Sequence, residues 1–408
     1  MSIPASSADA DVLVIGGGVI GLSIAWRAAQ HGHSVMLADS QPGRGATHAA
    51  AGMLTPIAEA AYAEREIFAL GQDSLRRYPA FIDELQGVTG LPTGYRRTGT
   101  LQVAYDSDDL SLLGEIRALQ ESFGVRLQQL SARECRDAEP LLDPSVRGGL
   151  LAPDDGSVDP RLLAEALLAA AQGSGARLIR QPAAEISCTA GRVTGARLAD
   201  GSSISARWTV LAAGWQSATL PGLPAGIAPP VRPVKGQILR LRTSGGPAAA
   251  GLPPGLLQRT LRGLVRGSSV YLVPRDSGEL VIGATQEELG ADTTVTAGGI
   301  WELLRDARAL VPGITELELA DAVAGLRPGT PDNAPVLGPA GLPGLVLATG
   351  HFRAGVLLAP VTADTVAAYL STGTPDPLWQ AFGAGRFTRP GSGDRHSNGG
   401  HRQEEAVA

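Results

Sequence analysis

The stretch from Asp11 to Gly21 constrains the fold most, because it places the glycine pattern G-x-G-x-x-G directly behind an apolar strand. In such a turn the first glycine, Gly16, permits the sharp bend, and the second, Gly18, lets the backbone approach a pyrophosphate. The third, Gly21, lets the following helix pack against the strand. Residues 22–30 predict that helix, whose free backbone N–H groups and positive dipole end would face the phosphates.

A second strand follows and ends beside an acidic residue. Residues 34–38 are mostly apolar and lead into Asp39, roughly 20 residues downstream, where such units carry the acid that binds a ribose. A glycine pattern alone is weak evidence, since Gly-rich turns are common. Strand, glycines, helix, strand and acid in this order predict a dinucleotide-binding unit.

Two later segments repeat the strand, glycine turn and helix without the full fingerprint. They are residues 345–369, with a helix expected from Gly355 to Tyr369, and residues 208–215, where an apolar strand runs into Gly214. No second G-x-G-x-x-G is present, whereas enzymes that reduce a flavin with a nicotinamide usually carry two such units. A second helix N-terminus favours a flavin, whose reduced ring is negatively charged. Taken alone, each segment is more typical of a βα unit without a ligand.

Five separated motifs give the chain a resemblance to a known family. They follow the order seen in the FAD-dependent D-amino-acid oxidase superfamily, and the chain is most similar to glycine oxidases of the thiamine-biosynthesis type. The motifs are the N-terminal glycine turn and residues 49–54, 233–237, 324–330 and 350–355. The resemblance runs from about Asp11 to about Phe382, and it is more specific for the superfamily than for glycine as the substrate.

The expected fold class is α/β, with a Rossmann-like FAD-binding domain interleaved with a smaller α+β substrate-binding domain built on an antiparallel sheet. The FAD-binding domain is predicted to be discontinuous. It comprises residues 1–85, 150–228 and 318–387, the substrate-binding domain comprises residues 86–149 and 229–317, and residues 388–408 form a tail. The tail lacks periodicity and is predicted to be disordered, so its histidines His396 and His401 indicate no metal site.

Local patterns support this alternation of elements. Helices are predicted at residues 64–85, 109–123 and 161–172. Turn residues predict hairpins at 192–206 and 270–283.

Oxidation of an α-amino acid on a flavin needs an anchor for the carboxylate, a face-on pose of the Cα–H bond and a free amine. Hydride leaves directly to the flavin, so no side-chain base is required. Arginine suits the anchor because its planar fork binds both carboxylate oxygens. The resemblance assigns Arg327 and Tyr271 to the substrate carboxylate and places Arg353 beside flavin and substrate. By pattern alone, each arginine is more typical of a structural salt bridge and the tyrosine of strand packing.

The resemblance also implies which residues hold FAD, which we expect to be non-covalent because no cysteine follows Cys188. Asp39 and Ser40 correspond to the ribose site, and Ala183 corresponds to a backbone contact with adenine. His351 contacts the cofactor mainly through its backbone, although its unperturbed pKa would suit a base. The full predicted set is Gly16, Gly18, Val19, Ile20, Gly21, Asp39, Ser40, Ala46, Thr47, Ala51, Gly52, Met53, Ala183, His351, Phe352, Arg353, Ala354, Gly355, Val356 and Leu357.

Three positions depart from the glycine-oxidase pattern. Gln286 stands where those enzymes commonly have an apolar pocket residue, and His48 and Ala354 differ as well. These departures bear on the identity of the substrate more than on the reaction.

Composition and charge limit the kinds of binding partner that the chain is expected to have. The chain has 408 residues, enough for two domains, and a net charge of −6 without a run of Lys or Arg. This charge pattern argues against nucleic acid and anionic membranes as partners. Residues 12–25 are too short and Gly-interrupted for a signal peptide or membrane span. Two cysteines provide neither a disulfide framework nor metal-ligand spacing, which predicts a cytoplasmic protein without metal.

The predicted function is an FAD-dependent oxidase that converts glycine or another small amino acid, with oxygen, into the imino acid, then the 2-oxo acid, ammonia and hydrogen peroxide. This enzyme, expected to be a homo-oligomer, would supply the glycine imine for thiamine thiazole synthesis. One alternative is a D-amino-acid oxidase of broader specificity, or a dehydrogenase that passes electrons to a quinone. A tRNA-modifying relative is disfavoured because no basic surface is indicated. Retention of Arg327 and Tyr271 disfavours a non-catalytic FAD-binding protein.

Overall fold

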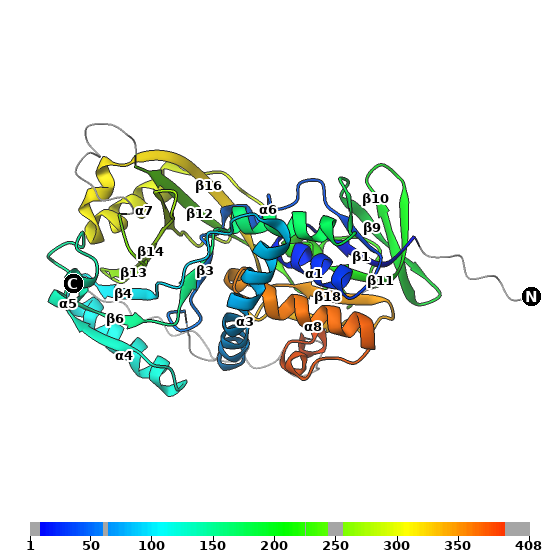
Figure 1. Ribbon diagram of the computed structural model, residues 1–408, viewed down its shortest axis with the longest axis horizontal. Coiled ribbons are helices and arrows are strands. Elements are labelled where there is room, and N and C mark those ends of the chain that lie inside the picture. The colour runs from blue at the N-terminus through cyan, green and yellow to red at the C-terminus, as the bar shows by residue number, and fades with distance from the viewer. Residues whose placement is uncertain (1–8, 60–63, 225, 244–255, 388–408) are drawn as a thin grey trace, which may run out of the picture.

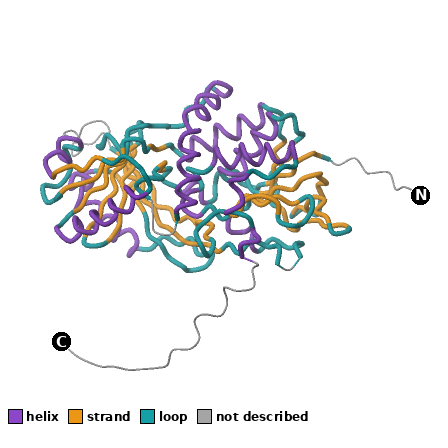
Figure 2. Tube along the Cα trace, turned by 90° about the horizontal axis from the view of Figure 1, so that it is seen from below, coloured by secondary structure: helices purple, strands orange, loops and turns teal. Residues whose placement is uncertain are grey.

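The computed structural model describes residues 9–59, 64–224, 226–243 and 256–387. Two β-sheets lie toward opposite ends of an elongated molecule (Figure 1). The same two groups of strands are visible from below, with a group of helices between them (Figure 2). The predicted tail, residues 388–408, lies outside the described residues.

The first sheet has the strand order β17-β18-β11-β1-β2-β8, with β10 beside β11 and β9 beside β10. Strands β18, β11, β1, β2 and β8 run parallel, and β9, β10 and β17 add antiparallel pairs. The central strands are almost entirely buried, as expected of a parallel sheet covered on both faces. Their bounds are β1 Ala10–Ile15, β2 Val35–Ala38, β8 Arg177–Ile179, β9 Ala183–Thr189, β10 Arg192–Leu198, β11 Ser203–Leu211, β17 Val336–Pro339 and β18 Leu345–Thr349.

Helices cover this sheet and share one hydrophobic core with its strands. Asp159 begins the helix α6 because its carboxylate accepts hydrogen bonds from the backbone N–H groups of Arg161 and Leu162, with Pro160 at the first helical position. Gly90 ends α3 with a φ of +68°, a left-handed conformation that favours glycine. The helices are α1 Val19–Gln30, α3 Arg65–Thr89, α6 Pro160–Gly173 and α8 Ala359–Thr372, and a short helix α2 spans Ala46–Ala49.

The second sheet has the order β16-β12-β15-β14-β13-β4-β6-β5 and is antiparallel except for the pair β4 and β13. Helix α7 packs against it through Leu303, Ala307 and Leu310. Helices α4 and α5 lie at its far end (Figure 1). The bounds are β4 Thr100–Ala104, α4 Ser107–Ser122, β5 Gln128–Ser131, α5 Ala132–Ala138, β6 Gly148–Ala152, β12 Arg232–Arg242, β13 Thr260–Val265, β14 Ser268–Pro274, β15 Glu279–Gly283, α7 Ala297–Leu310 and β16 Glu318–Gly329.

The chain passes repeatedly from one sheet to the other. Within the described residues it crosses to the second sheet after β2, returns after β6, crosses again after β11 and returns after β16. Two short strands, β3 (Met53–Leu54) and β7 (Gly156–Ser157), pair antiparallel at the first two passages. This interleaving confirms the predicted fold class.

The predicted elements are present, with differences at three places. Helix α8 begins at Ala359 rather than Gly355, because a turn with a positive φ at Phe352 comes first. Strand β16 pairs with β12 in the second sheet, although the sequence placed the residues from 318 onward in the FAD-binding part. Strand β6 likewise crosses the predicted boundary between residues 149 and 150. In both cases hydrogen bonds to a neighbouring strand decide to which sheet the strand belongs. The local sequence pattern contains no information about these partners.

Candidate active site

The carboxyl ends of the parallel strands meet at one edge of the first sheet and form a wall of a cavity of about 700 Å³, here called the main cavity. Strand β1 leads into Gly16, β2 into Asp39, β11 into Ala212 and β18 into Gly350, and all four residues line it. Such an edge is the usual ligand site of an α/β sheet. The opposite wall comes from β12, β14 and β16 of the second sheet.

The structure brings most of the predicted site residues together. Those that line the main cavity are Gly16, Gly18, Val19, Ile20, Asp39, Ala46, Thr47, Ala51, Gly52, Met53, Tyr271, Arg327, His351, Phe352, Arg353, Gly355 and Val356. Of the three positions that depart from the family pattern, only Gln286 is among the lining residues.

Five predicted cofactor residues do not line the main cavity: Gly21, Ser40, Ala183, Ala354 and Leu357. Gly21 packs under the Gly16 carbonyl, where a Cβ would overlap it, so its role is in packing. Leu357 is buried in the core and its carbonyl accepts a hydrogen bond from Ser74. Ala354 also packs against that core, Ser40 is exposed, and Ala183 is the first residue of β9, where it packs against another core cluster of the first sheet.

The glycine turn has the close approach that a pyrophosphate site requires. Gly16 has a φ of +104°, and a Cβ there would lie 2.5 Å from the Ala212 carbonyl oxygen, so only glycine fits. At the start of α1 the Val19 N–H donates to Thr47 Oγ1 at 3.0 Å. The Asp39 carboxylate accepts from the Gly17 N–H at 2.6 Å, which fixes the acid beside the turn. These features fit a bound dinucleotide.

A buried arginine holds the segment that follows helix α2. Arg275 is only 3% exposed, and its guanidinium donates to the Ala51 carbonyl and, at 2.8 Å, to the Val158 carbonyl. Burial lowers the pKa of Arg275 to about 10, although the carboxylate of Asp159 opposes this shift. Gly52 has a φ of +72° and no room for a Cβ beneath the Val158 carbonyl. Arg275 was not predicted as a site residue, because its only signal in the sequence was a charge at the end of an apolar strand.

Arg327 and Tyr271 lie at the second-sheet side of the main cavity. The Arg327 Nη1 donates to the Thr285 carbonyl at 3.1 Å and to the Lys235 carbonyl at 3.4 Å. Among the described residues no carboxylate forms an ion pair with it, so its charge is available to an anion in the cavity. Loss of hydration raises the pKa of Tyr271, with partial opposition from the Arg327 guanidinium. The Tyr271 hydroxyl therefore stays protonated and able to donate.

Two other arginines that line the main cavity are paired with carboxylates. Arg262, opposite Tyr271 in the β13–β14 register, lies 2.6 Å from the carboxylate of Glu59. Arg353 lies 3.0 Å from Glu64 and 3.9 Å from Glu59. Arg353 thus forms the structural salt bridge that is typical of its sequence pattern. Arg327 forms no such bridge with any described residue. Neither Arg262 nor Glu59 was predicted as a site residue, because both lie outside the glycine motifs.

His351 is buried and unsuited to acid–base work. Burial lowers its pKa to about 3, and its Nε2 lies 3.2 Å from Thr362 Oγ1. The imidazole is therefore neutral at physiological pH and occupied by a neighbouring hydroxyl.

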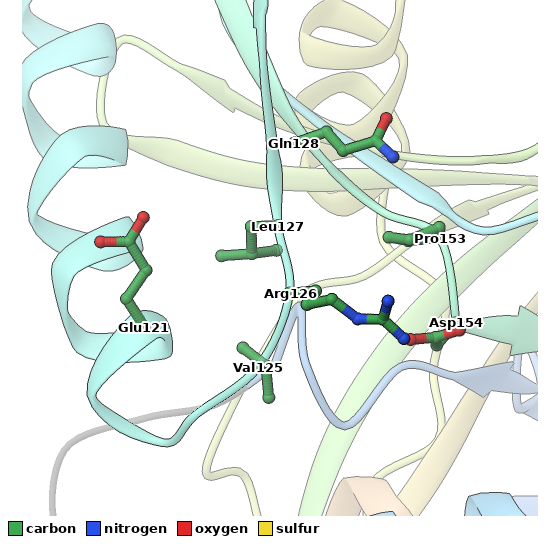
Figure 3. A pocket seen from close by; sticks show the side chains of 7 residues that line it. All are labelled: Glu121, Val125, Arg126, Leu127, Gln128, Pro153 and Asp154. Carbon is green, nitrogen blue, oxygen red and sulfur yellow. The ribbon is translucent and has the colours of Figure 1, made fainter.

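A second hollow, of about 530 Å³, lies near β5 at the far end of the second sheet (Figure 3). It is lined by Glu121, Val125, Arg126, Leu127, Gln128, Pro153 and Asp154. Figure 3 shows the Arg126 side chain directed toward Asp154. This hollow contains no glycine turn and none of the predicted site residues, so the main cavity is the candidate active site.

Within residues 9–59, 64–224, 226–243 and 256–387, no cluster of three or more His, Cys, Asp or Glu side chains is arranged to hold a metal ion. No helix in those ranges has both the length and the apolar character needed to cross a membrane.

The glycine turn at a helix N-terminus and the unpaired arginine face each other across one cavity, which defines the class as a dinucleotide-dependent enzyme with an anion site. Comparison with known families is more specific. The profile described as "FAD dependent oxidoreductase" (DAO) matches residues 11–369. The chain belongs to this family, and its cofactor is FAD.

Individual relatives agree with this assignment. The chain is 35% identical over 393 residues to the bifunctional protein ThiO/ThiG of Trichormus variabilis, covering 94% of this chain and 56% of the relative. It is 33% identical over 364 residues to the glycine oxidase of Geobacillus kaustophilus, covering 88% of this chain and 92% of that enzyme. The crystal structure of glycine oxidase from Geobacillus kaustophilus superposes with a TM-score of 0.83 at 31% identity, covering 93% of this chain and 99% of that one. The chain thus spans little more than half the length of the ThiO/ThiG relative.

Proposed function

We propose that this protein is an FAD-dependent oxidase that deaminates glycine or another small amino acid to the imino acid. Water then converts the imino acid to the 2-oxo acid and ammonia, and oxygen is reduced to hydrogen peroxide. The observation that carries the proposal is the guanidinium of Arg327, which has no ion-pair partner among the described residues. It lies with Tyr271 in the cavity that the glycine turn lines. The names glycine oxidase and ThiO/ThiG among the relatives support a role in supplying glycine imine for thiamine thiazole synthesis.

In this proposal Arg327 binds the substrate carboxylate through its guanidinium, and the Tyr271 hydroxyl donates a further hydrogen bond to it. A charge-assisted bidentate contact is both strong and directional. Two contacts on one carboxylate leave the Cα–H bond free to point toward the first-sheet wall. Positioning of this kind is a large part of what an enzyme contributes to such a reaction.

No side chain of the main cavity is required as a base. His351 is a very weak base, and loss of hydration keeps the Tyr271 hydroxyl protonated. The substrate amine therefore loses its proton to water before oxidation. FAD, when bound, supplies the acceptor for the hydride from Cα and passes the electrons on to oxygen.

The residues proposed to hold FAD follow from the same geometry. Val19 begins α1, and Thr47 of α2 lies beside it and accepts a hydrogen bond from its N–H. A pyrophosphate would accept hydrogen bonds from backbone N–H groups at this helix end. Asp39 would bind the ribose hydroxyls, and Ala51 and Gly52 would lie under the ring system.

Oxygen uptake by the purified holoprotein tests this function. With glycine and a series of D-amino acids as substrates, we expect turnover with equal amounts of hydrogen peroxide and ammonia. With sarcosine the amine released is methylamine. A protein that binds FAD but turns over none of these amines would overturn the proposal in favour of the non-catalytic alternative.

One observation favours the broader alternative, a D-amino-acid oxidase or dehydrogenase. Gln286, Ser269 and Thr293 line the main cavity, and an exposed, flexible glutamine admits larger substrates than an apolar wall does. One methylene in a closed pocket changes selectivity by about 1–3 kcal/mol. A kcat/KM for any bulky D-amino acid at least tenfold above that for glycine would replace the glycine assignment. Reduction of a quinone in preference to oxygen would indicate a dehydrogenase.

We further propose that the two sheets are the cores of an FAD-binding and a substrate-binding domain, and that the protein is a cytoplasmic homo-oligomer. The interleaved strand order supports the first statement. Sedimentation analysis and cell fractionation would test the others.

A further inference from the structure

Glu287 does not line the main cavity, but it lies at the centre of a hydrogen-bond network behind Arg327. Its Oε1 accepts from Thr285 Oγ1 at 2.5 Å and from Gln237 Nε2 at 2.8 Å. Its Oε2 lies 3.5 Å from the Nζ of Lys235, whose side chain has no exposed surface. Burial raises the pKa of Glu287, but these hydrogen bonds and the Lys235 charge bring it below its usual value. The carboxylate is therefore ionised at neutral pH.

The residues of this network also carry both carbonyl groups that accept hydrogen bonds from Arg327. Lys235 and Glu287 exchange two backbone hydrogen bonds, of 2.8 and 3.0 Å, and the Gln237 N–H donates to Thr285 Oγ1 at 2.9 Å. The Glu287 side chain thus ties β12, which carries the Lys235 carbonyl, to the segment after β15, which carries the Thr285 carbonyl. Arg327 Nη1 donates to both.

We infer that Glu287 is a positioning residue for Arg327. It fixes the two carbonyl acceptors that orient the guanidinium, and with Asp292, 2.6 Å from the Lys235 ammonium, it neutralises that buried charge. The inference rests on the proposed function, because it concerns the side chain that would bind the substrate carboxylate.

The neighbouring residue offers a matched control. Glu288 has a side chain that is 59% exposed and pairs with Arg232 at the surface, so it has no place in this network. The probe is glycolate, a small carboxylate without an amine, titrated into the holoprotein and followed by the change in flavin absorbance. We expect Glu287→Ala to weaken glycolate binding and to raise KM for the amine substrate by about tenfold. The substitution removes the carboxylate to which Thr285, Gln237 and Lys235 are bound. The value of kcat and the affinity for FAD should change little.

Two more variants separate positioning from a general effect on folding. Glu287→Gln keeps one acceptor but lacks the charge, so its loss should be intermediate, and Glu288→Ala should behave as the wild type. Glu287→Ala in an Arg327→Ala background should cause no further loss of glycolate binding, because residues that act through one another are not additive. If Glu287→Ala does not fold with FAD, Thr285→Val, which keeps the carbonyl but removes the hydroxyl, takes its place in the cycle.

Equal losses with and without Arg327, or a Glu287→Ala protein that matches Glu288→Ala, would overturn the inference. Wild-type protein that binds glycolate through Arg327 but oxidises no amine would instead overturn the proposed oxidase function. The two failures are therefore distinguishable.

Discussion

The guanidinium of Arg327 lies directly over Gly236 of the neighbouring strand β12, so that a Cβ on this glycine would overlap Nη1, Nη2 and Cζ. In the β12–β16 register Gly236 pairs with Gly325, so neither residue of that pair has a side chain. An arginine can extend across the adjacent strand only where that strand leaves such a space. Position 236 therefore controls where the proposed carboxylate anchor lies.

Gly236→Ala should displace Arg327 without unfolding the protein, because the overlapping atoms are the end of a flexible side chain. Misplacement by about 1 Å can cost 10²-fold in an active site, so we expect a drop in kcat/KM of about that size. Steady-state kinetics with the preferred amine would measure it. Gly298→Ala is the control, since a Cβ there meets nothing within 4 Å, and equal activity of the two variants would contradict the prediction.

Arg327→Ala should weaken substrate capture by about 2–5 kcal/mol while leaving the flavin spectrum intact. Arg353→Ala should have a smaller effect, since that side chain is 36% exposed and paired with Glu64. Comparison of kcat/KM for the two variants decides between the arginines. A larger loss for Arg353→Ala would show that Arg353 holds the carboxylate.

Arg275→Met should lower the affinity for FAD by about tenfold, because the Ala51 and Val158 carbonyls lose a buried donor. It leaves the partly buried carboxylate of Asp159 without this partner, so thermal stability should fall as well. FAD titration of the apoprotein, followed by fluorescence, would measure the first effect. Arg266→Met, at an exposed position, is expected to match the wild type.

Asp155 predicts a specific dependence of stability on pH. It is fully buried, and burial, with a contribution from Glu59, raises its pKa to about 8 even though the Ala58 N–H donates to it. The folded protein keeps this proton up to about pH 8, whereas an unfolded chain releases it near pH 4. The free energy of unfolding therefore falls as pH rises through this window, by up to about 1.4 kcal/mol per pH unit for this group.

Asp155→Asn should remove that part of the slope, because the amide is neutral at every pH. Urea unfolding at pH 5, 6.5 and 8 would measure this effect. As pH rises, the free energy of unfolding of the variant should increase relative to that of the wild type. The exposed neighbour gives the control, Asp154→Asn, which should track the wild type at all three values. Parallel curves for wild type and Asp155→Asn would mean that the carboxyl is already ionised in the fold.

FAD should be bound without a covalent link, because cysteine is absent after Cys188 in the sequence. Acid precipitation should give a colourless pellet and a yellow supernatant. Yellow colour that remains in the washed pellet would show a covalent bond to another residue.

Local pattern was enough to predict the elements around the glycine turn. Glycine positions, apolar strands and Asp39 are close in sequence, and the fold confirms the βαβ unit that they indicate. The roles of Arg327 and Tyr271 came from resemblance and stay predictions, although the structure places both in the main cavity.

Contacts between distant residues could not be predicted in this way. Arg275 reaches Ala51 from more than two hundred residues away, and β16 joins the second sheet through its pairing with β12. Arg262 and Glu59 meet for the same reason, since β13 and the segment after β3 carry no shared motif. Such partners depend on how the sheets are assembled, which a single sequence does not state.

The order in which the chain visits the two sheets has a consequence for integrity. Because the first sheet holds strands from both the beginning and the end of the described chain, no single break of the backbone can release one sheet from the other. A protease that cuts a surface loop between β1 and β18 would leave two fragments held together, each contributing strands to the same hydrogen-bonded sheet. The two walls of the main cavity would then separate only when the hydrogen bonds of the first sheet break.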